Sequence, residues 1–148
     1  MSAPTISTNA LYDFIDQYQL AFNSFHVKNL IPHFAFPLQV IHKEACHVYA
    51  DSSKLEAVLQ GGMQFYKKNN ITSVAISALQ KHAINEQLAF LKIKLSFCRS
   101  DKQELYHCHY ELILRRSKHK EFKIKMSKNQ ELDFCFEKNG SQIIYNSK

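Results

Sequence analysis

The apolar residues between positions 11 and 25 recur every three or four residues. Seven positions make up this stripe: Leu11, Phe14, Ile15, Tyr18, Ala21, Phe22 and Phe25. Such spacing places side chains on one face of an α-helix, so the segment predicts a helix that buries that face. Tyr18 lies in the middle of the stripe and brings a hydroxyl group into an apolar contact, where a phenol requires a hydrogen-bond partner. The rest of the chain must supply a surface that covers this helix.

Shorter elements are expected next along the chain. The segment from Val27 to Phe34 keeps the helical spacing, but Pro32 limits it to a short helix because proline is tolerated only in a first turn. Two short strands follow, at 38–42 and 46–50. Ser53 and Glu56 have the spacing of a capping box and begin a second long helix.

From residue 72 onward the hydrophobic pattern changes from helical spacing to alternation, which predicts strands. Four runs alternate: Thr72–Ala83, Leu88–Arg99, Glu104–Arg116 and Glu121–Met126. Short polar connections separate them, as in antiparallel hairpins. Asn139-Gly140 between two extended stretches predicts a further hairpin. We therefore expect one domain over residues 1–148, with a core of about 9–126 and a C-terminal hairpin or extension over 127–148.

The composition is typical of a globular domain, with 45% hydrophobic and 22% charged residues. No apolar run is long enough to span a bilayer, and the N-terminus does not resemble a secretory signal. We therefore expect a cytoplasmic protein without a membrane partner. The four cysteines lack C-x-x-C spacing, so we expect reduced thiols. The formal charge of +6 comes from scattered lysines rather than one basic block, which disfavours a nucleic-acid partner.

Two segments carry a resemblance to a known family. Tyr18–Phe34 contains an aromatic residue, then Ala-Phe-Asn, then a Leu-x-x-x-Phe spacing, while Tyr110–Arg116 and Phe122–Ile124 form a closing hairpin. These patterns are similar to the nuclear transport factor 2-like superfamily, which includes ketosteroid isomerases, scytalone dehydratase and SnoaL-like polyketide cyclases. The resemblance implies an α+β, cystatin-like fold in which a cone-shaped, curved antiparallel sheet wraps around the N-terminal helices. It does not specify a reaction, because the fold hosts enzymes, carriers and interaction modules.

The ketosteroid isomerases of this family suggest roles for three positions. They place an oxyanion-donating tyrosine in the first helix, where this chain has Tyr18. His42 and Tyr110 stand where these isomerases have an aspartate base and a protonated aspartate. A histidine can act as a base near neutral pH and phenols can donate hydrogen bonds to an oxyanion, so we hypothesise that Tyr18, His42 and Tyr110 line an apolar pocket. The alternative interpretation is a pair of core tyrosines and a histidine at the rim.

Two classes of function are open at this point. One is an uncharacterised small-molecule-binding domain with a pocket for a small hydrophobic ligand and cofactor-independent acid/base chemistry of the isomerase, dehydratase or cyclase type. The other is a non-catalytic, dimeric accessory or protein-interaction module. Whether the chain is an enzyme is left undecided, and no cofactor is expected.

Partners and metals follow from the predicted outer face of the sheet. Phe90, Cys98 and Ile113 stand among charged residues there, and we expect a homodimer through this face. His107 and His109 share a face two residues apart, but a solvent-facing pair explains them better than a metal site, so no metal is expected.

Overall fold

The computed structural model describes residues 7–42, 45–119 and 121–129. The helical segments are α1 (Thr8–Ser24), α2 (Val27–Leu30), the 3-10 turn η1 (Ile31–His33) and α3 (Ser52–Lys68). The strands are β1 (Phe34–His42), β2 (Ala45–Tyr49), β3 (Ser73–Ala83), β4 (Leu88–Cys98), β5 (Glu104–Arg116) and β6 (Phe122–Asn129). The predicted hairpin around Asn139-Gly140 lies outside the described residues. None of the helices in the described part of the chain is long and apolar enough to cross a membrane.

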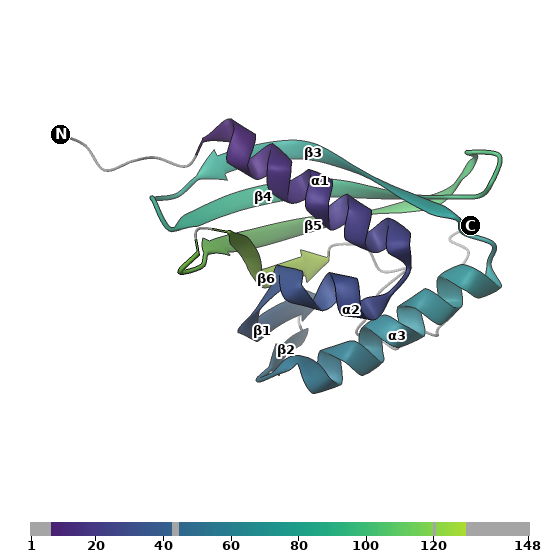
Figure 1. The fold of residues 1–148 in the computed structure, drawn as a ribbon, viewed down its shortest axis with the longest axis horizontal. Coiled ribbons are helices and arrows are strands. Elements are labelled where there is room, and N and C mark those ends of the chain that lie inside the picture. Colours follow the sequence, from purple (N-terminus) through teal and green to yellow (C-terminus); the bar gives the residue numbers. More distant parts are fainter. Residues whose placement is uncertain (1–6, 43–44, 120, 130–148) are drawn as a thin grey trace.

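The six strands form one curved sheet in the order β2-β1-β6-β5-β4-β3. Strands β3 to β6 pair antiparallel, as expected for consecutive hairpins, whereas β1 runs parallel to β6. The sheet is therefore mixed rather than wholly antiparallel. All the helices lie on one side of it: α1 crosses β3 and its neighbours, and α3 runs beside β1 and β2 (Figure 1). This arrangement confirms the predicted α+β class with N-terminal helices covering the sheet.

The core lies between α1 and the concave face of the sheet. Strand β4 shows the alternation most clearly, since every second side chain is buried and the intervening ones are partly exposed. The buried set of β4 is Ala89, Leu91, Ile93, Leu95 and Phe97. The apolar stripe of α1 from Leu11 to Phe22 is buried against this face, as its spacing predicted.

Two amide side chains of α1 satisfy the open edge of β3. The Asn23 amide nitrogen donates to the Val74 carbonyl oxygen at 2.8 Å, and the Val74 N–H donates to the Asn23 amide oxygen at 2.9 Å. The Ile76 N–H donates to the Gln19 side-chain oxygen at 2.7 Å. Since β3 is an edge strand, these bonds occupy backbone groups that have no neighbouring strand. Helix α1 is thereby fixed in register with the sheet.

Strand β6 is longer than the sequence predicted. The expected end at Met126 is wrong, because the strand continues to Asn129. Ile113 pairs with Met126 while Leu114 pairs with Ile124, so one extra residue is inserted between the two pairs. A bulge of this kind changes which side chains face inward. After it, Ser127 and Asn129 are buried in the concave face.

Candidate functional site

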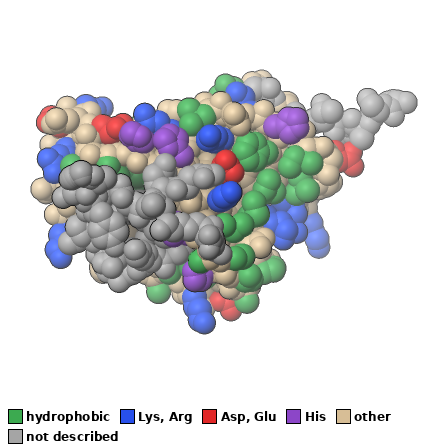
Figure 2. All heavy atoms as spheres, turned by 180° about the vertical axis from the view of Figure 1, so that it is seen from behind, with side chains coloured by type: hydrophobic (Ala, Val, Ile, Leu, Met, Phe, Trp, Pro, Cys, Tyr) green, Lys and Arg blue, Asp and Glu red, His purple; other side chains and the backbone are tan. Residues whose placement is uncertain are grey.

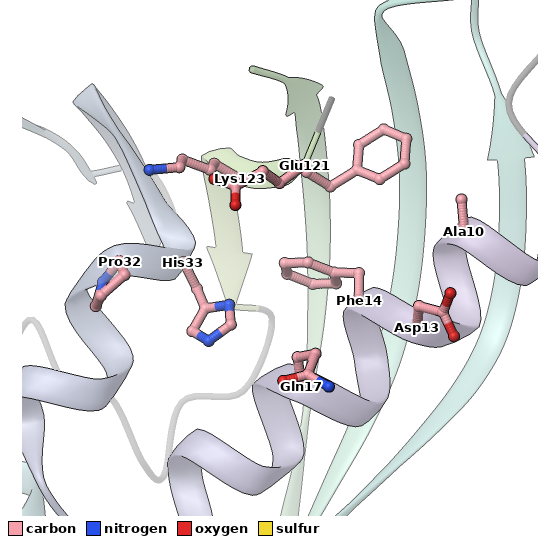
Figure 3. A pocket seen from close by; sticks show the side chains of 9 residues that line it. Ala10, Asp13, Phe14, Gln17, Pro32, His33, Glu121 and Lys123 are labelled. Carbon is pink, nitrogen blue, oxygen red and sulfur yellow. The ribbon is translucent and has the colours of Figure 1, made fainter. Parts of the chain in front are cut away.

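A groove of about 390 Å³ opens between α1, η1 and the start of β6. Its volume lies at the lower end of the range of roughly 300 to 1,000 Å³ that is typical of ligand pockets. An aromatic ring forms much of its floor, and ionisable groups stand around its rim (Figure 3). The lining residues are Ala10, Asp13, Phe14, Gln17, Pro32, His33, Glu121, Phe122 and Lys123.

Helical spacing brings the α1 wall of the groove together. Ala10, Phe14 and Gln17 follow one another at intervals of four and three residues, and Asp13 lies one turn before Gln17. Phe14 belongs to the buried stripe of α1, whereas Asp13 and Gln17 are exposed. The groove therefore runs along the boundary between the buried and the exposed sides of the helix.

His33 projects into the groove from η1 and is half-buried. Its ring meets the rings of Phe14 and Tyr18 edge-on, with centroid distances of 6.0 and 5.7 Å. Burial lowers the pKa of His33 below its ordinary value, and the positive charge of Lys123 lowers it further, while Glu121 acts in the opposite direction. His33 is consequently neutral at pH 7, so one ring nitrogen can donate a hydrogen bond and the other can accept one.

The wall opposite α1 is built by the first residues of β6. Pairing between β1 and β6 begins at Phe34 with Ile124, so the residues before Ile124 have no β1 neighbour. Glu121 and Lys123 border the groove at this position. Figure 3 shows them across from α1 and above His33, with the amino group of Lys123 directed away from α1.

A second, much smaller cavity lies inside the cone. Its volume is about 30 Å³, which gives room for about one water molecule but not for an organic ligand. Most of its lining is apolar and includes Leu38, Leu55, Leu59 and Leu95. Its polar side chains are Tyr18, Tyr110 and Ser127. The interior of the cone is therefore almost completely filled by the chain's own side chains.

Aromatic rings separate the two spaces. Tyr18 lines the small cavity, and its ring stacks on Phe14, which lines the groove, at a centroid distance of 5.5 Å. Phe22 and Phe34 meet Tyr18 edge-on from the cavity side. Only 8% of Tyr18 is exposed, and this burial, with a smaller effect of Cys108, raises the pKa of its phenol. Tyr18 therefore stays protonated at physiological pH.

The structure brings two of the three predicted site residues together. Tyr18 and Tyr110 line the same small cavity, whereas His42 does not line it. His42 is nevertheless on the same row of the sheet as Tyr110, because both pair with Asn129 of the intervening strand. The Nδ1 atom of His42 is buried without a hydrogen-bond partner among the described residues. A catalytic role for Tyr18, His42 and Tyr110 stays a prediction.

Sequence patterns did not predict His33, Ser127 or Asn129 as inward-facing residues. His33 follows a proline in a short turn, where no periodicity marks an inward side chain. A partial signal was present, since Pro32-His33 ends the helical spacing immediately before a strand. For Ser127 and Asn129 no signal was available, because their inward orientation depends on the bulge in β6.

The outer face of the sheet carries the surface that was predicted to form a dimer. Phe90 lies opposite Ile113, and Ile113 lies opposite Met126, so the three form one apolar row across β4, β5 and β6. Cys98 lies at the other end of β4 and is not part of this row. Figure 2 shows this side, with hydrophobic side chains among lysine and arginine side chains.

The outer face also carries the two histidines of β5. Nδ1 of His107 lies 2.9 Å from a carboxylate oxygen of Glu104, and the rings of His107 and His109 are 5.3 Å apart. Within residues 7–42, 45–119 and 121–129, no three His, Cys, Asp or Glu side chains come together as a metal site.

Three solved structures illustrate the fold that this chain shares. An NTF-2 like protein of unknown function from Shewanella oneidensis is 11% identical with a TM-score of 0.61, and the match covers 85% of this chain and 100% of that chain. A domain of unknown function with a cystatin-like fold from Nostoc punctiforme is 15% identical with a TM-score of 0.64, and the match covers 86% of this chain and 80% of that chain. A ketosteroid isomerase-like protein from Erwinia carotovora atroseptica is 12% identical with a TM-score of 0.55, and the match covers 84% of this chain and 95% of that chain. At such identities the similarity concerns the fold alone.

The family comparison covers most of the chain. No curated protein sequence matches it. Residues 9–131 match a family described as NTF2-like protein (DUF6841), and this range contains all of α1 except its first residue, the whole sheet and every residue of the groove. The resemblance inferred from Tyr18–Phe34 and the closing hairpin is thereby confirmed. The chain belongs to the NTF2-like protein family DUF6841.

Proposed function

We propose that this chain is a small-molecule-binding domain whose ligand binds in the groove between α1, η1 and β6. The difference between the two cavities supports this proposal: the groove measures about 390 Å³ and the interior cavity about 30 Å³. The ligand therefore binds in this groove rather than in the small interior cavity. We also propose the cytoplasm as the location.

The chemistry of the groove defines the kind of ligand. Its apolar part packs against Phe14, whose ring is held in place by Tyr18. Its polar part reaches His33, which in the neutral form offers both a donor and an acceptor. A small, partly apolar molecule of about ten heavy atoms suits this combination.

His33 is the groove residue best suited to acid/base chemistry. Its lowered pKa keeps the basic form populated at neutral pH. Reactions of the isomerase, dehydratase or cyclase type need such a base beside the substrate. We therefore place any proton transfer at His33, and the set of Tyr18, His42 and Tyr110 stays the alternative prediction for a catalytic site.

The first test asks whether the groove binds a neutral amphipathic probe. Titration of the ¹⁵N-labelled protein with 3-phenylpropan-1-ol should shift backbone amide signals of α1 and η1, with a dissociation constant on the order of 1 mM. Ala10→Trp should abolish these shifts, because the larger side chain fills the groove. Leu20→Trp is the matched control, since Leu20 belongs to the same helix but is 65% exposed and does not line the groove. Equal binding to both variants would refute the proposal.

A non-catalytic dimeric module remains the second candidate function. The observation that favours it is the apolar row of Phe90, Ile113 and Met126 on the outer face. In that function the filled cone acts as a rigid scaffold and the outer face binds a second copy. Absence of probe binding in the groove together with a stable dimer would favour this candidate.

A further inference from the structure

One histidine, His33, is found among the lining residues that the structure describes in the groove. Histidine is the side-chain type whose charge changes between about pH 5 and pH 8 at its ordinary pKa. The ring of His33 therefore can connect the binding of a ligand in this groove to the pH of the medium.

The imidazole ring of His33 is partly covered by aromatic side chains. Phe14 and Tyr18 contact it edge-on, with centroid distances of 6.0 and 5.7 Å, and both of these residues are buried. The ring itself is only half-buried and projects into the groove between η1 and α1 (Figure 3). The part of the ring that the aromatic side chains leave uncovered is therefore solvated from the groove.

A ligand in the groove removes this solvation. Its apolar part packs on Phe14 and so comes to lie beside His33, because the two rings are in contact. An imidazolium ion loses more hydration free energy on burial than a neutral imidazole does, so burial disfavours the protonated form. The neutral ring can still exchange a hydrogen bond with a hydroxyl group of the ligand. Binding of the ligand and protonation of His33 therefore oppose each other.

The charged groups around His33 do not reverse this effect. On α1, Asp13 lines the groove and the phenol of Tyr18 stays protonated, while Lys123 and Glu121 at the start of β6 act on the pKa of His33 with opposite signs. Helices α2 and α3 also contact η1, but among the described residues neither of them contributes a charge that acts on this pKa. Burial has the largest effect on the pKa and Glu121 the smallest, so further burial by a ligand adds to the dominant influence.

We propose that His33 is a pH-sensitive switch of the groove: its neutral ring permits a neutral, partly apolar ligand to bind, and its protonation in a mildly acidic medium weakens binding and releases the ligand. This inference rests on the proposed function, since it concerns the regulation of the same groove. The coupling is reciprocal, so the bound ligand must in turn make His33 harder to protonate.

The affinity for 3-phenylpropan-1-ol at two pH values tests the switch, because this probe carries no charge at either of them. It is titrated into the full ¹⁵N-labelled chain at pH 7.5 and at pH 5.0, with the amide signals of α1 and η1 as the readout. We expect the dissociation constant to be about five times larger at pH 5.0. His33→Gln should remove this difference, because an amide stays neutral at both pH values. His26→Gln is the matched control, since His26 is exposed and does not line the groove, and it should keep the difference.

The reciprocal measurement needs no substitution. The ring signals of His33 are followed by NMR as the pH is lowered, once in the free chain and once with an excess of 3-phenylpropan-1-ol. We expect the probe to lower the pKa of His33, because it covers the part of the ring that is solvated from the groove. The ring signals of the exposed His26 serve as the internal control.

The outcomes separate this inference from the function on which it rests. If the probe binds in the groove with the same affinity at both pH values, the switch is wrong and the groove remains a ligand site. A pH dependence that persists in His33→Gln refutes the switch as well, and so does a pKa of His33 that the probe does not lower. If the probe does not shift the groove signals at pH 7.5, both the proposed function and this inference fail.

Discussion

His33 takes its chemistry from residues that are distant in the sequence. Phe14 and Tyr18 of α1 contact its ring, and Lys123 and Glu121 at the start of β6 act on its charge. A histidine at the end of a short turn carries no pattern of its own that indicates such surroundings. Its neutral state at pH 7 is therefore a property of the folded chain and not of the local segment.

The titration of His33 tests this description. The pKa measured by NMR from its ring signals should lie below the ordinary value of about 6.5. Lys123→Gln should raise this pKa, because it removes a positive charge, whereas Glu121→Gln should lower it. His26, which is exposed, serves as the internal control. Shifts of the same sign in both variants would contradict the proposed surroundings of His33.

The same pKa has a consequence for stability. Because the native state binds the proton of His33 less readily than the unfolded chain does, the free energy of unfolding should decrease as the pH falls below about 6.5 towards the pKa of the folded state. Above pH 6.5 this contribution is complete. His33→Gln should make this decrease in the free energy of unfolding smaller, as measured by urea denaturation across this pH range. If the pH profile of the variant equals that of the wild type, the lowered pKa of His33 is refuted.

At the scale of elements, the attachment of α1 to β3 explains the asparagine of the Ala21-Phe22-Asn23 segment. The apolar stripe provides burial but does not determine how far the helix can slide along the sheet. The hydrogen bonds from Asn23 to both backbone groups of Val74 do determine it, since they exist in one register only. The bond of Gln19 to Ile76 repeats this attachment one turn earlier.

Removal of the Asn23 amide should therefore destabilise the fold. Asn23→Ala leaves the N–H and C=O groups of Val74 without partners, and an unsatisfied backbone group in a buried setting costs about 1 to 3 kcal/mol. We expect a loss of this size in the free energy of unfolding from guanidinium denaturation. Gln60→Ala, on the exposed side of α3, should change it by less than about 0.5 kcal/mol. Equal effects of the two substitutions would show that the attachment contributes little.

At the scale of the whole molecule, the sheet presents two different faces. Its concave face is filled by α1 and the core, and its outer face carries one apolar row between rows of charged side chains. Lys92, Glu111 and Lys128 form one neighbouring row, in which the charges alternate. In a dimer with a two-fold axis, this row of one copy can face the same row of the other copy, so that lysines lie next to glutamates. A homodimer through this face stays a prediction.

Sedimentation of the chain measures its oligomeric state directly. We expect twice the mass of the 17.2 kDa chain, and we expect Ile113→Lys to produce the monomer because it places a charge in the centre of the apolar row. Leu105→Lys is the matched control at the opposite end of β5, outside the row. A monomeric wild-type chain at micromolar concentration would refute the prediction, and so would a dimer that Ile113→Lys leaves intact.

Much of the fold followed from local spacing. The predictions of α1 from its apolar stripe and of β3, β4 and β5 from their alternation were correct. In a helix every third or fourth side chain faces the core, and in a strand every second one does, whatever element packs against it. The segment Tyr18–Phe34 also indicated the family. These features depend on the order of residues within one element, and the sequence records that order directly.

Tertiary structure alone decided the candidate site. The parallel pairing of β1 with β6, and the absence of a β1 neighbour before Ile124, open the groove beside Glu121 and Lys123. The bulge in β6 turns Ser127 and Asn129 inward, and packing within the cone reduces the predicted pocket around Tyr18 and Tyr110 to about 30 Å³. Each of these outcomes depends on contacts between elements far apart in the chain, so the spacing of residues within one element carries no information about them.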